Sequence, residues 1–163
     1  MARPSSSGPS GTKLIAANRR ARRNYEILET VEAGLVLRGS EVKSLRAAKV
    51  QIAEAYARID DGEAWLHGMH VAPYDHAQAH SGHDPERRRK LLLHRREIDR
   101  LRSLVDEQRL ALVPLSLYFK DGRAKVELAL ARGRKTYDKR QVLAKRDAER
   151  EAARAIARAG RGD

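Results

Sequence analysis

Six histidines raise the first chemical question, because imidazoles at suitable positions in a chain can bind zinc. They are His67, His70, His76, His80, His83 and His94. His67 and His70 are an odd number of positions apart in a predicted strand, so their side chains point to opposite faces. Three of the others lie in a loop that contains proline and glycine and has no fixed geometry. We therefore expect no metal site.

The chain also lacks the patterns that support catalysis. It has no cysteine, which excludes disulfides, cysteine-based zinc sites and thiol catalysis. No nucleophile elbow, HExxH motif or phosphate-binding glycine loop occurs, and Gly133-Arg134-Lys135 lacks the preceding glycine of such a loop. A hydrolase would need a nucleophile with a positioned base, or a pair of carboxylates. We expect a binding protein that is not an enzyme and carries no cofactor.

The positive charge of the chain is concentrated at its two ends. There are 34 Lys or Arg against 22 Asp or Glu, a net charge of +12. Residues 1–23 hold six cations and no acid, residues 132–163 hold eleven cations and five acids, and the segment between them is neutral. The ends are either solubilising tails or binding segments for a polyanion, such as nucleic acid or an anionic membrane surface. No apolar run approaches the roughly 20 residues that span a bilayer.

Two arginine patterns are candidates for phosphate contacts. Arg87–Lys90 precedes the apolar run Leu91–Leu93, and Arg95-Arg96 follows it. The apolar run is typical of a buried strand, while the flanking cations either meet phosphates or form an ordinary solvated edge. The second pattern places arginines four residues apart, which forms one ridge of a predicted helix. Its members are Arg146, Arg150, Arg154 and Arg158.

Two Asp-Gly pairs predict β-hairpins. Residues 55–71 turn at Asp61-Gly62, and residues 110–131 turn at Asp121-Gly122. Asp-Gly between alternating apolar runs is the strongest short-range hairpin signal. In the second hairpin the alternating apolar positions are Leu115, Leu117, Phe119, Ala124, Val126, Leu128 and Leu130.

One further strand and two helices complete the predicted core. Residues 24–38 alternate as a strand, which we expect to bend near Ala33-Gly34. Residues 40–49 have helical spacing with Ser40 as a plausible N-cap, and residues 94–108 present one apolar helical face. Most sheet connections are antiparallel, and closure removes exposed edges. The expected fold is mainly β, a closed antiparallel oligonucleotide-binding-like barrel with short flanking α-helices and a basic C-terminal tail.

Composition divides the chain into three parts. Residues 1–12 are rich in Ser, Gly and Pro and should form a disordered leader. Residues 13–133 should form the barrel, and residues 134–163 the basic tail. Within the tail, residues 138–159 favour helix by propensity, with Asp138 as a cap. They have no apolar face to hold them against the barrel, so we expect a tail that is disordered when free and helical on a partner.

Several motifs in the chain resemble, in sequence and in order, those of one known family. The motifs are Asn18-Arg19-Arg20-Ala21, Glu32-Ala33-Gly34, Gly39–Arg46 (GSEVKSLR), Asp84-Pro85, Arg89–His94 (RKLLLH) and Tyr137–Arg140 (YDKR). The family is that of the SsrA-binding protein, also called small protein B, and the resemblance covers about residues 13–158. Each motif alone would be weak, but the ordered set is highly specific.

The resemblance implies a function in rescuing stalled bacterial ribosomes. The family binds the tRNA-like domain of transfer-messenger RNA, which is charged with alanine and carried by elongation factor Tu with GTP. It brings this RNA to ribosomes stalled on messages without a stop codon, where the RNA encodes a degradation tag. By this resemblance the chain would be an RNA-binding adaptor in trans-translation, cytoplasmic and monomeric, with no membrane partner.

The resemblance also implies which residues contact RNA. In the barrel they are Asn18, Arg19, Arg20, Glu32, Leu92, Lys125, Arg132, Gly133 and Arg134. The tail would enter the decoding centre and the empty message channel of the ribosome, against 16S ribosomal RNA. The resemblance assigns to it Tyr137, Asp138, Lys139, Arg140 and the apolar Ile156, and the four-residue spacing of the arginines adds Arg146, Arg150 and Arg154. Glu32 would accept hydrogen bonds from base edges or ribose, and its alternative role is a surface ion pair.

The chain departs from the family pattern at two alanines. Ala48 stands where the family usually has glycine, and Ala157 where a bulkier apolar residue is common. If position 48 needs a positive φ, alanine costs on the order of 1 kcal/mol there. Two alternative functions remain open: a ribosomal protein or assembly factor that binds ribosomal RNA, and an RNA-processing enzyme, for which the sequence offers no site.

Overall fold

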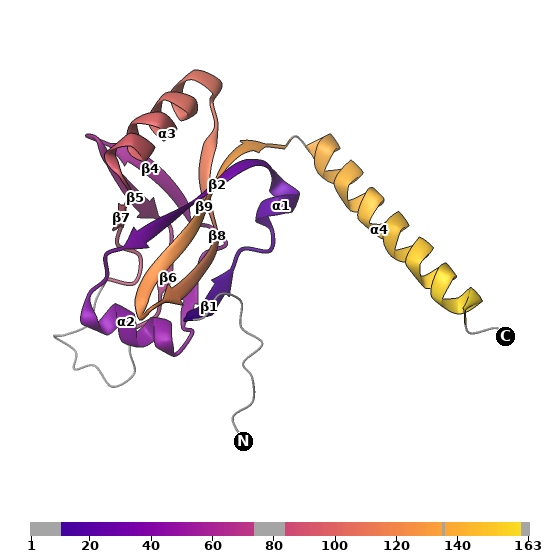
Figure 1. Cartoon of the computed structure of the whole chain (residues 1–163), viewed down its shortest axis with the longest axis horizontal. Coiled ribbons are helices and arrows are strands. Elements are labelled where there is room, and N and C mark those ends of the chain that lie inside the picture. Colours follow the sequence, from indigo (N-terminus) through magenta and orange to yellow (C-terminus); the bar gives the residue numbers. More distant parts are fainter. Residues whose placement is uncertain (1–10, 74–83, 135, 161–163) are drawn as a thin grey trace.

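A computed structural model describes residues 11–73, 84–134 and 136–160 as a mainly β protein with four helices (Figure 1). The strands are β1 Thr12–Ala17, β2 Tyr25–Leu35, β3 Val50–Gln51, β4 Tyr56–Asp60, β5 Glu63–His67, β6 His70–Val71, β7 Arg89–Leu92, β8 Ala111–Lys120 and β9 Arg123–Gly133. The helices are α1 Ala21–Asn24, α2 Gly39–Arg46, α3 Arg95–Gln108 and α4 Thr136–Ala159.

Both predicted hairpins are confirmed, with their turns at the expected residues. Asp61-Gly62 joins β4 to β5, and Asp121-Gly122 joins β8 to β9. Both residues of each turn have positive φ, 52° and 75° in the first turn and 50° and 78° in the second. Two consecutive positive φ angles match the hairpin geometry that Asp-Gly favours, because glycine has no Cβ and aspartate tolerates the left-handed region.

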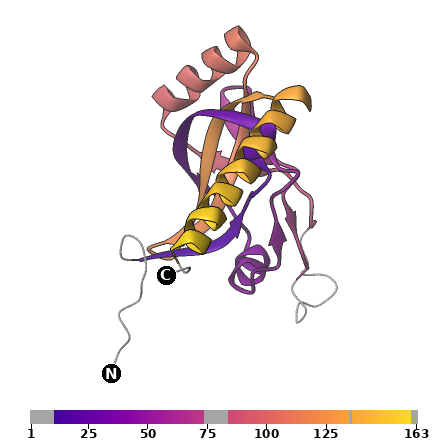
Figure 2. The same cartoon turned by 90° about the vertical axis from the view of Figure 1, so that its right-hand side faces the viewer.

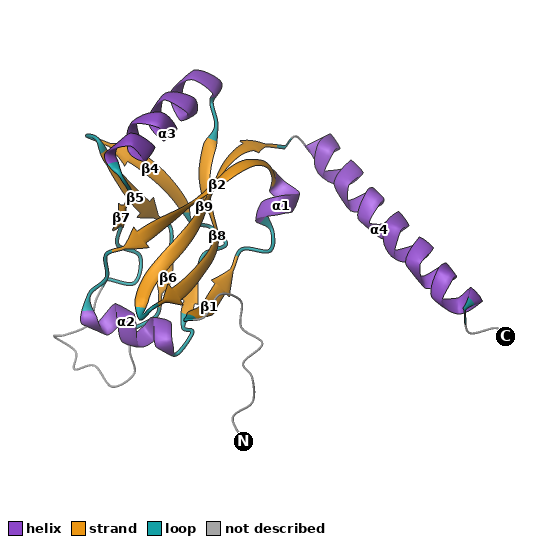
Figure 3. Cartoon of the chain, in the orientation of Figure 1, coloured by secondary structure: helices purple, strands orange, loops and turns teal. Residues whose placement is uncertain are grey.

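Seven of the nine described strands form one sheet in the order β1-β8-β4-β5-β7-β2-β9, in which β9 also pairs with β8, and β3 and β6 form a separate two-stranded sheet. Every strand pairing is antiparallel. On the side of β8 away from β9, β4 pairs near the start of the strand and β1 pairs along its end. Figure 3 shows the strands curving around one another, with α3 and α2 at opposite ends of the sheet.

Apolar side chains fill the inside of the curved sheet. Leu117, Val126 and Leu128 of the second hairpin are buried there, as their alternation predicted. α3 packs against the same core through the buried side chain of Leu101, and Ile98 on the same helical face is also buried. The predicted helix over residues 94–108 is therefore confirmed together with its apolar face.

A second, smaller core lies on the other face of β8 and β9. Ala21 of α1 packs there with Val113, Leu115, Ala129 and Ala131. The register between β8 and β9 shifts at Leu115, between Pro114 and Ser116. The extra residue turns Leu115 into this second core, which corrects the prediction that Leu115 shares the face of Leu117. Neither α1 nor β1 was predicted from the sequence.

A buried carboxylate attaches α2 to the sheet. Glu41 and Arg89 have no exposed surface, and the Nε of Arg89 donates a hydrogen bond to Glu41 at 2.5 Å. A guanidinium nitrogen of Arg87 also donates to Glu41. The backbone N–H of Arg38 donates to the Glu41 carboxylate at 2.8 Å and so caps the helix. Ser40, the predicted N-cap, lies inside α2 instead.

The C-terminal end of α2 places Ala48 in the positive-φ conformation that is costly for alanine. Ala48 has a φ of 57°. Its N–H donates to the carbonyl of Leu45, and the N–H of Lys49 donates to the carbonyl of Ser44, both at 2.9 Å. This pair of hydrogen bonds is the Schellman motif, in which glycine usually occupies the left-handed position.

Two further predictions about strands differ from the structure, and a third is not tested by it. The register of β2 against β9 shifts at Leu28, and the bend expected near Ala33-Gly34 stays a prediction. The predicted hairpin over residues 55–71 is interrupted after β5, because Gly68 has a φ of 75°. β1 begins at Thr12, within the segment expected to be a leader.

α4 extends away from the sheet in Figure 1 and lies in front of the strands in the turned view of Figure 2. Its described side chains are exposed except for Val142, which is half-buried. The helix begins at Thr136, so Asp138 lies in its first turn rather than at a cap. That the segment is disordered without a partner stays a prediction. Among the described residues, no helix has the length and apolar character needed to cross a membrane.

Candidate RNA-binding surface

Side chains from four strands form a row across the outer face of the sheet. Leu92 pairs with Gly34, Gly34 with Lys125, Lys125 with Tyr118, and Tyr118 with Leu14. Leu92 and Leu14, at the ends of the row, are 55% and 62% exposed. Leu92 and Lys125, which the resemblance implied as RNA contacts, are thus neighbours across β2, and Tyr118 and Leu14 extend the row.

Gly34 is the reason that Leu92 and Lys125 are not separated by a side chain of β2. A Cβ built on Gly34 would lie 3.2 Å from the Cβ of Leu92. Any larger residue would push against Leu92, so the row needs a glycine or a shift of β7 at this position.

Glu32 lies on the same face, two residues before Gly34 on β2. Its carboxylate accepts a hydrogen bond from the hydroxyl of Tyr118 at 2.5 Å, and it is 3.5 Å from the Nζ of Lys120. The hydrogen bond from Tyr118 lowers the pKa of Glu32, aided by the charges of Lys120 and Lys125 and opposed by desolvation. The surface ion pair that the sequence left open is therefore present, and the Glu32 side chain remains 39% exposed.

Tyr118 is the residue of this surface that the sequence analysis missed. Burial and the neighbouring Glu32 raise the pKa of Tyr118, so the phenol stays protonated and can donate its hydrogen bond. A signal for this position was available in the sequence. A two-residue turn pairs residues at equal distances on either side, so Asp121-Gly122 sets Tyr118 opposite Lys125.

Asn18, Arg19 and Arg20 lie where β1 ends and α1 is about to begin. The Nδ2 of Asn18 donates to the carbonyl oxygen of Pro114 at 3.1 Å, and its backbone N–H donates to Leu115 at 2.7 Å. Asn18 therefore attaches this segment to β8, which makes its role at least partly structural. Arg19 and Arg20 are exposed and are available to a ligand.

Arg132, Gly133 and Arg134 lie on the other side of α1, at the end of β9. Arg132 and Gly133 are exposed, and Arg134 is half-buried. The backbone N–H of Arg134 donates to the carbonyl oxygen of Asn24 at 2.9 Å. The end of β9 is thereby joined to α1, so both groups of predicted RNA contacts flank the same short helix.

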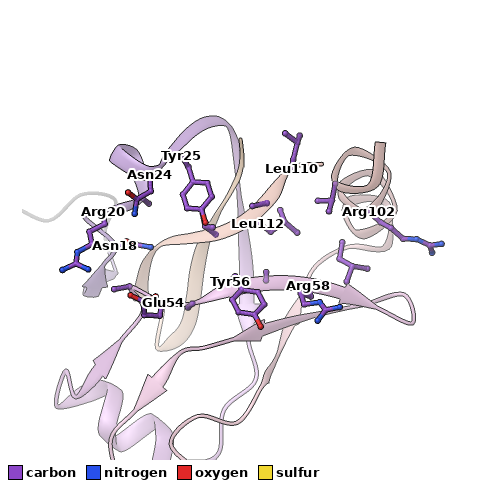
Figure 4. Close-up of a pocket in the computed structure, with 18 of the residues that line it drawn as sticks. Asn18, Arg20, Asn24, Tyr25, Glu54, Tyr56, Arg58, Arg102, Leu110 and Leu112 are labelled. Carbon is purple, nitrogen blue, oxygen red and sulfur yellow. The ribbon is translucent and has the colours of Figure 1, made fainter. Parts of the chain in front are cut away.

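A cavity of about 670 Å³ opens beside this helix, between β4 and β8 (Figure 4). Its walls include Asn18 and Arg20 before α1, Tyr25 at the start of β2, Tyr56 on β4 and Arg102 on α3. Figure 4 shows Tyr25 and Tyr56 on facing sides of the cavity. The sequence analysis did not predict this site, because it depends on the separation of two distant strands.

Arg87 and Arg89 of the basic run fit neither alternative that the sequence left open, a phosphate contact or a solvated edge. Arg89 is buried and donates to Glu41 and to backbone carbonyls, and Arg87 also contacts Glu41. Leu92, expected in a buried strand, is exposed, while Leu91 is buried. The reason is that alternate residues of β7 point to opposite faces of the sheet, so Arg89 and Leu91 point inward.

The structure assigns two of the histidines to other contacts. The ring of His67 stacks on that of Tyr56, with 5.4 Å between centroids and 8° between planes. The Nδ1 of His70 is 3.5 Å from Glu86. Within the described segments, no three His, Cys, Asp or Glu side chains are grouped as metal ligands. The remaining loop histidines, His76, His80 and His83, lie outside the described residues.

The predicted ribosome-contacting residues of the tail all lie on α4. Tyr137, Asp138 and Lys139 belong to its first turns. Arg140, Arg146, Arg150, Arg154 and Arg158 are exposed, and Ile156 is 74% exposed. A spacing of four residues puts the last four arginines along one side of the helix. That these residues contact ribosomal RNA stays a prediction.

A mainly β fold with an aromatic ring and cations on one face of the sheet is typical of RNA-binding proteins. A family model described as "SmpB protein" matches residues 15–158. The SsrA-binding protein of Desulforudis audaxviator is 59% identical over 150 residues, 92% of this chain and 95% of that protein. That of Mycolicibacterium paratuberculosis is 56% identical over 156 residues, 95% of this chain and 92% of that protein.

A solved structure described as "tmRNA-SmpB: a journey to the center of the bacterial ribosome" contains a similar chain. The two chains are 54% identical, with a TM-score of 0.62 over 74% of this chain and 85% of the other. The chain belongs to the SmpB family, and the resemblance stated from its motifs is confirmed.

Proposed function

We propose that this protein is the transfer-messenger-RNA-binding adaptor of trans-translation. It binds the tRNA-like domain of that RNA and delivers it to stalled ribosomes for rescue and for tagging of the nascent chain. The observation that carries the proposal is the convergence of Glu32, Leu92 and Lys125, from three strands, on one face beside Tyr118. The SsrA-binding proteins among its relatives, at 56% and 59% identity, support the same RNA partner.

The sheet would serve this function as a closed oligonucleotide-binding-like barrel. The pairings that support closure run from β8 through β4, β5, β7, β2 and β9 back to β8. The junction between β4 and β8 consists of a single residue pair, Ala57 opposite Leu112. A stiff barrel would hold the row of RNA contacts in fixed positions before the RNA arrives, which reduces the entropy lost on binding.

Residues 134–163 would act as a separate, ribosome-binding tail. The segment would be disordered when free and would form a helix in the decoding centre and message channel, against 16S ribosomal RNA. Its exposed cations and its small contact with the body support this role. Elongation factor Tu with GTP would join through the RNA, and the protein would act as a cytoplasmic monomer without a catalytic step of its own.

The alternative function is that of a ribosomal protein or ribosome assembly factor. An RNA pull-down distinguishes the two functions. The tagged protein is purified from a bacterial lysate, and the bound RNA is sequenced. Strong enrichment of transfer-messenger RNA, with the protein substoichiometric on ribosomes, is expected. Recovery of ribosomal RNA alone, with one copy of the protein on each ribosome, would support the alternative.

A truncation tests whether body and tail have separate functions. A chain that ends at Arg134 keeps the hydrogen bond from its N–H to Asn24 and loses α4. It should retain most of its affinity for the tRNA-like domain but should not support tagging on stalled ribosomes. Normal tagging by this truncated chain would contradict the proposed role of the tail.

A further inference from the structure

The cavity between β4 and β8 is open because these strands pair at only one position. Ala57 lies opposite Leu112, and beyond this pair β1 takes the place of β4 beside β8. Residues of α1 and of α3 both line the cavity that results. The volume of about 670 Å³ lies in the range of roughly 300–1,000 Å³ that is typical of pockets for small organic groups.

Two tyrosine rings give the cavity a preference for flat, aromatic groups. Tyr25 and Tyr56 line it from facing sides, and Tyr56 is 44% exposed. His67, which is not part of the lining, stacks parallel to the ring of Tyr56 and restricts its motion. An exposed aromatic ring that is already held in place is well suited to stack on a nucleobase.

The charges of the lining favour an uncharged group inside the cavity. The lining includes three arginines, Arg20, Arg58 and Arg102, and three acids, Glu54, Asp60 and Asp106. These charges balance, so a phosphate would gain no net attraction inside, whereas the carboxylates can accept hydrogen bonds from the amino groups of a base. In Figure 4 the guanidinium groups of Arg20 and Arg102 point outward at opposite ends, where phosphates of a passing strand would lie.

We propose that this cavity receives one unpaired base of the bound RNA, stacked on Tyr56, while the flanking phosphates contact the arginines at its rim. The inference rests on the proposed binding of the tRNA-like domain and adds a mode of recognition to it. Asn18 and Arg20 connect the two sites, because they line the cavity and also belong to the predicted RNA contacts. RNA on the outer face would reach the cavity past α1.

A double-mutant cycle between protein and RNA tests this contact. The probe is the tRNA-like domain of Mycolicibacterium smegmatis transfer-messenger RNA, since the SsrA-binding protein of that organism is 54% identical to this chain. One abasic nucleotide is introduced at each unpaired position in turn. Each RNA is titrated with the full-length protein and with its Tyr56→Leu variant.

One abasic position should weaken binding to the wild-type protein about tenfold and should not weaken binding to Tyr56→Leu further. Tyr56→Phe should bind like the wild type, because stacking needs the ring and not the hydroxyl. Trp65→Leu is the matched control, since it removes a ring from the neighbouring strand β5 outside the cavity lining. It should bind the RNA within about twofold of the wild type, as expected for a residue without a base contact.

Photo-crosslinking of the unmodified protein gives a second measurement that does not depend on a stable variant. Iodinated pyrimidines at the unpaired positions should crosslink to Tyr56 or Tyr25, as identified by mass spectrometry. Full affinity of Tyr56→Leu, or additive effects at every abasic position, would overturn the base pocket while leaving the RNA-binding function intact. A wild-type protein that does not bind the tRNA-like domain at all would instead overturn the proposed function.

Discussion

Glu41 and Arg89 are 48 residues apart in the sequence and form an ion pair in which neither side chain has any exposed surface. They belong to two motifs that helped to define the family, GSEVKSLR and RKLLLH. The pair joins α2 to β7, and β7 carries Leu92 to the outer face. In these two motifs Glu41 and Arg89 therefore stabilise the fold, whereas the exposed Leu92 lies on the candidate RNA surface.

Glu41→Gln should destabilise the protein by about 3–5 kcal/mol, because it leaves the guanidinium of Arg89 buried without its counter-charge. Urea unfolding followed by circular dichroism measures the loss. Glu97→Gln is a matched control: Glu97 caps α3 by accepting a hydrogen bond from the N–H of His94, but it is not buried. Its replacement should cost less than about 1 kcal/mol, and equal losses in the two variants would contradict the role of burial.

Ala48→Gly should stabilise the protein by about 1 kcal/mol. The position has a φ of 57°, which costs alanine on the order of 1 kcal/mol relative to glycine. Ala47→Gly is the control, because the neighbouring residue has a φ of −84° and should gain nothing. Thermal unfolding of the two variants checks the prediction, which fails if Ala48→Gly lowers the melting temperature.

Glu32→Ala should weaken binding to the tRNA-like domain by about 1–3 kcal/mol, although it removes a negative charge from a polyanion site. The reason is the loss of an oriented acceptor for base or ribose donors. Glu127 lies opposite Glu32 on β9, so Glu127→Ala removes the same charge from the same face as a control. It should bind with equal or higher affinity. Tighter binding by Glu32→Ala in a titration at fixed salt would rule out the acceptor role.

Tyr118→Phe should raise the pKa of Glu32 toward its ordinary value of 4.5, because the hydroxyl that stabilises the charged carboxylate is lost. The pKa of Glu32 in the folded protein is lowered, so its contact stabilises the fold above the unfolded-state pKa. That stabilisation is lost as the pH falls through the lower folded-state pKa. An NMR titration of the Glu32 carboxyl carbon measures the shift. In Tyr56→Phe, the control, the pKa of Glu32 should not change.

Ala152→Pro should abolish tagging on stalled ribosomes while leaving binding of transfer-messenger RNA intact. Proline inside α4 costs about 3 kcal/mol of helix stability and removes no charge. Arg150→Ala keeps the helix propensity and removes one cation of the ridge, so it should only weaken tagging. Tagging in a reconstituted translation reaction compares the two. A Pro variant that tags at the normal rate would show that the tail acts as an extended basic chain.

Local sequence determined the parts of this protein that short-range geometry can specify. Asp61-Gly62 and Asp121-Gly122 predicted both turns, because few dipeptides accept two positive φ angles. The apolar spacing that includes Ile98 and Leu101 predicted α3 and its buried face. The ordered motifs also identified the family, which the relatives confirm.

Only the tertiary structure decided which residues meet across distant strands. The bulges at Leu28 and Leu115 set the faces of the adjoining residues, and a register shift of one residue leaves no trace in composition. The same holds for Arg89, whose charge suggested an exposed position, because its buried partner Glu41 lies 48 residues away in the sequence. The cavity at Tyr56 likewise exists because β4 and β8 separate, which depends on how the whole sheet closes and not on any local segment.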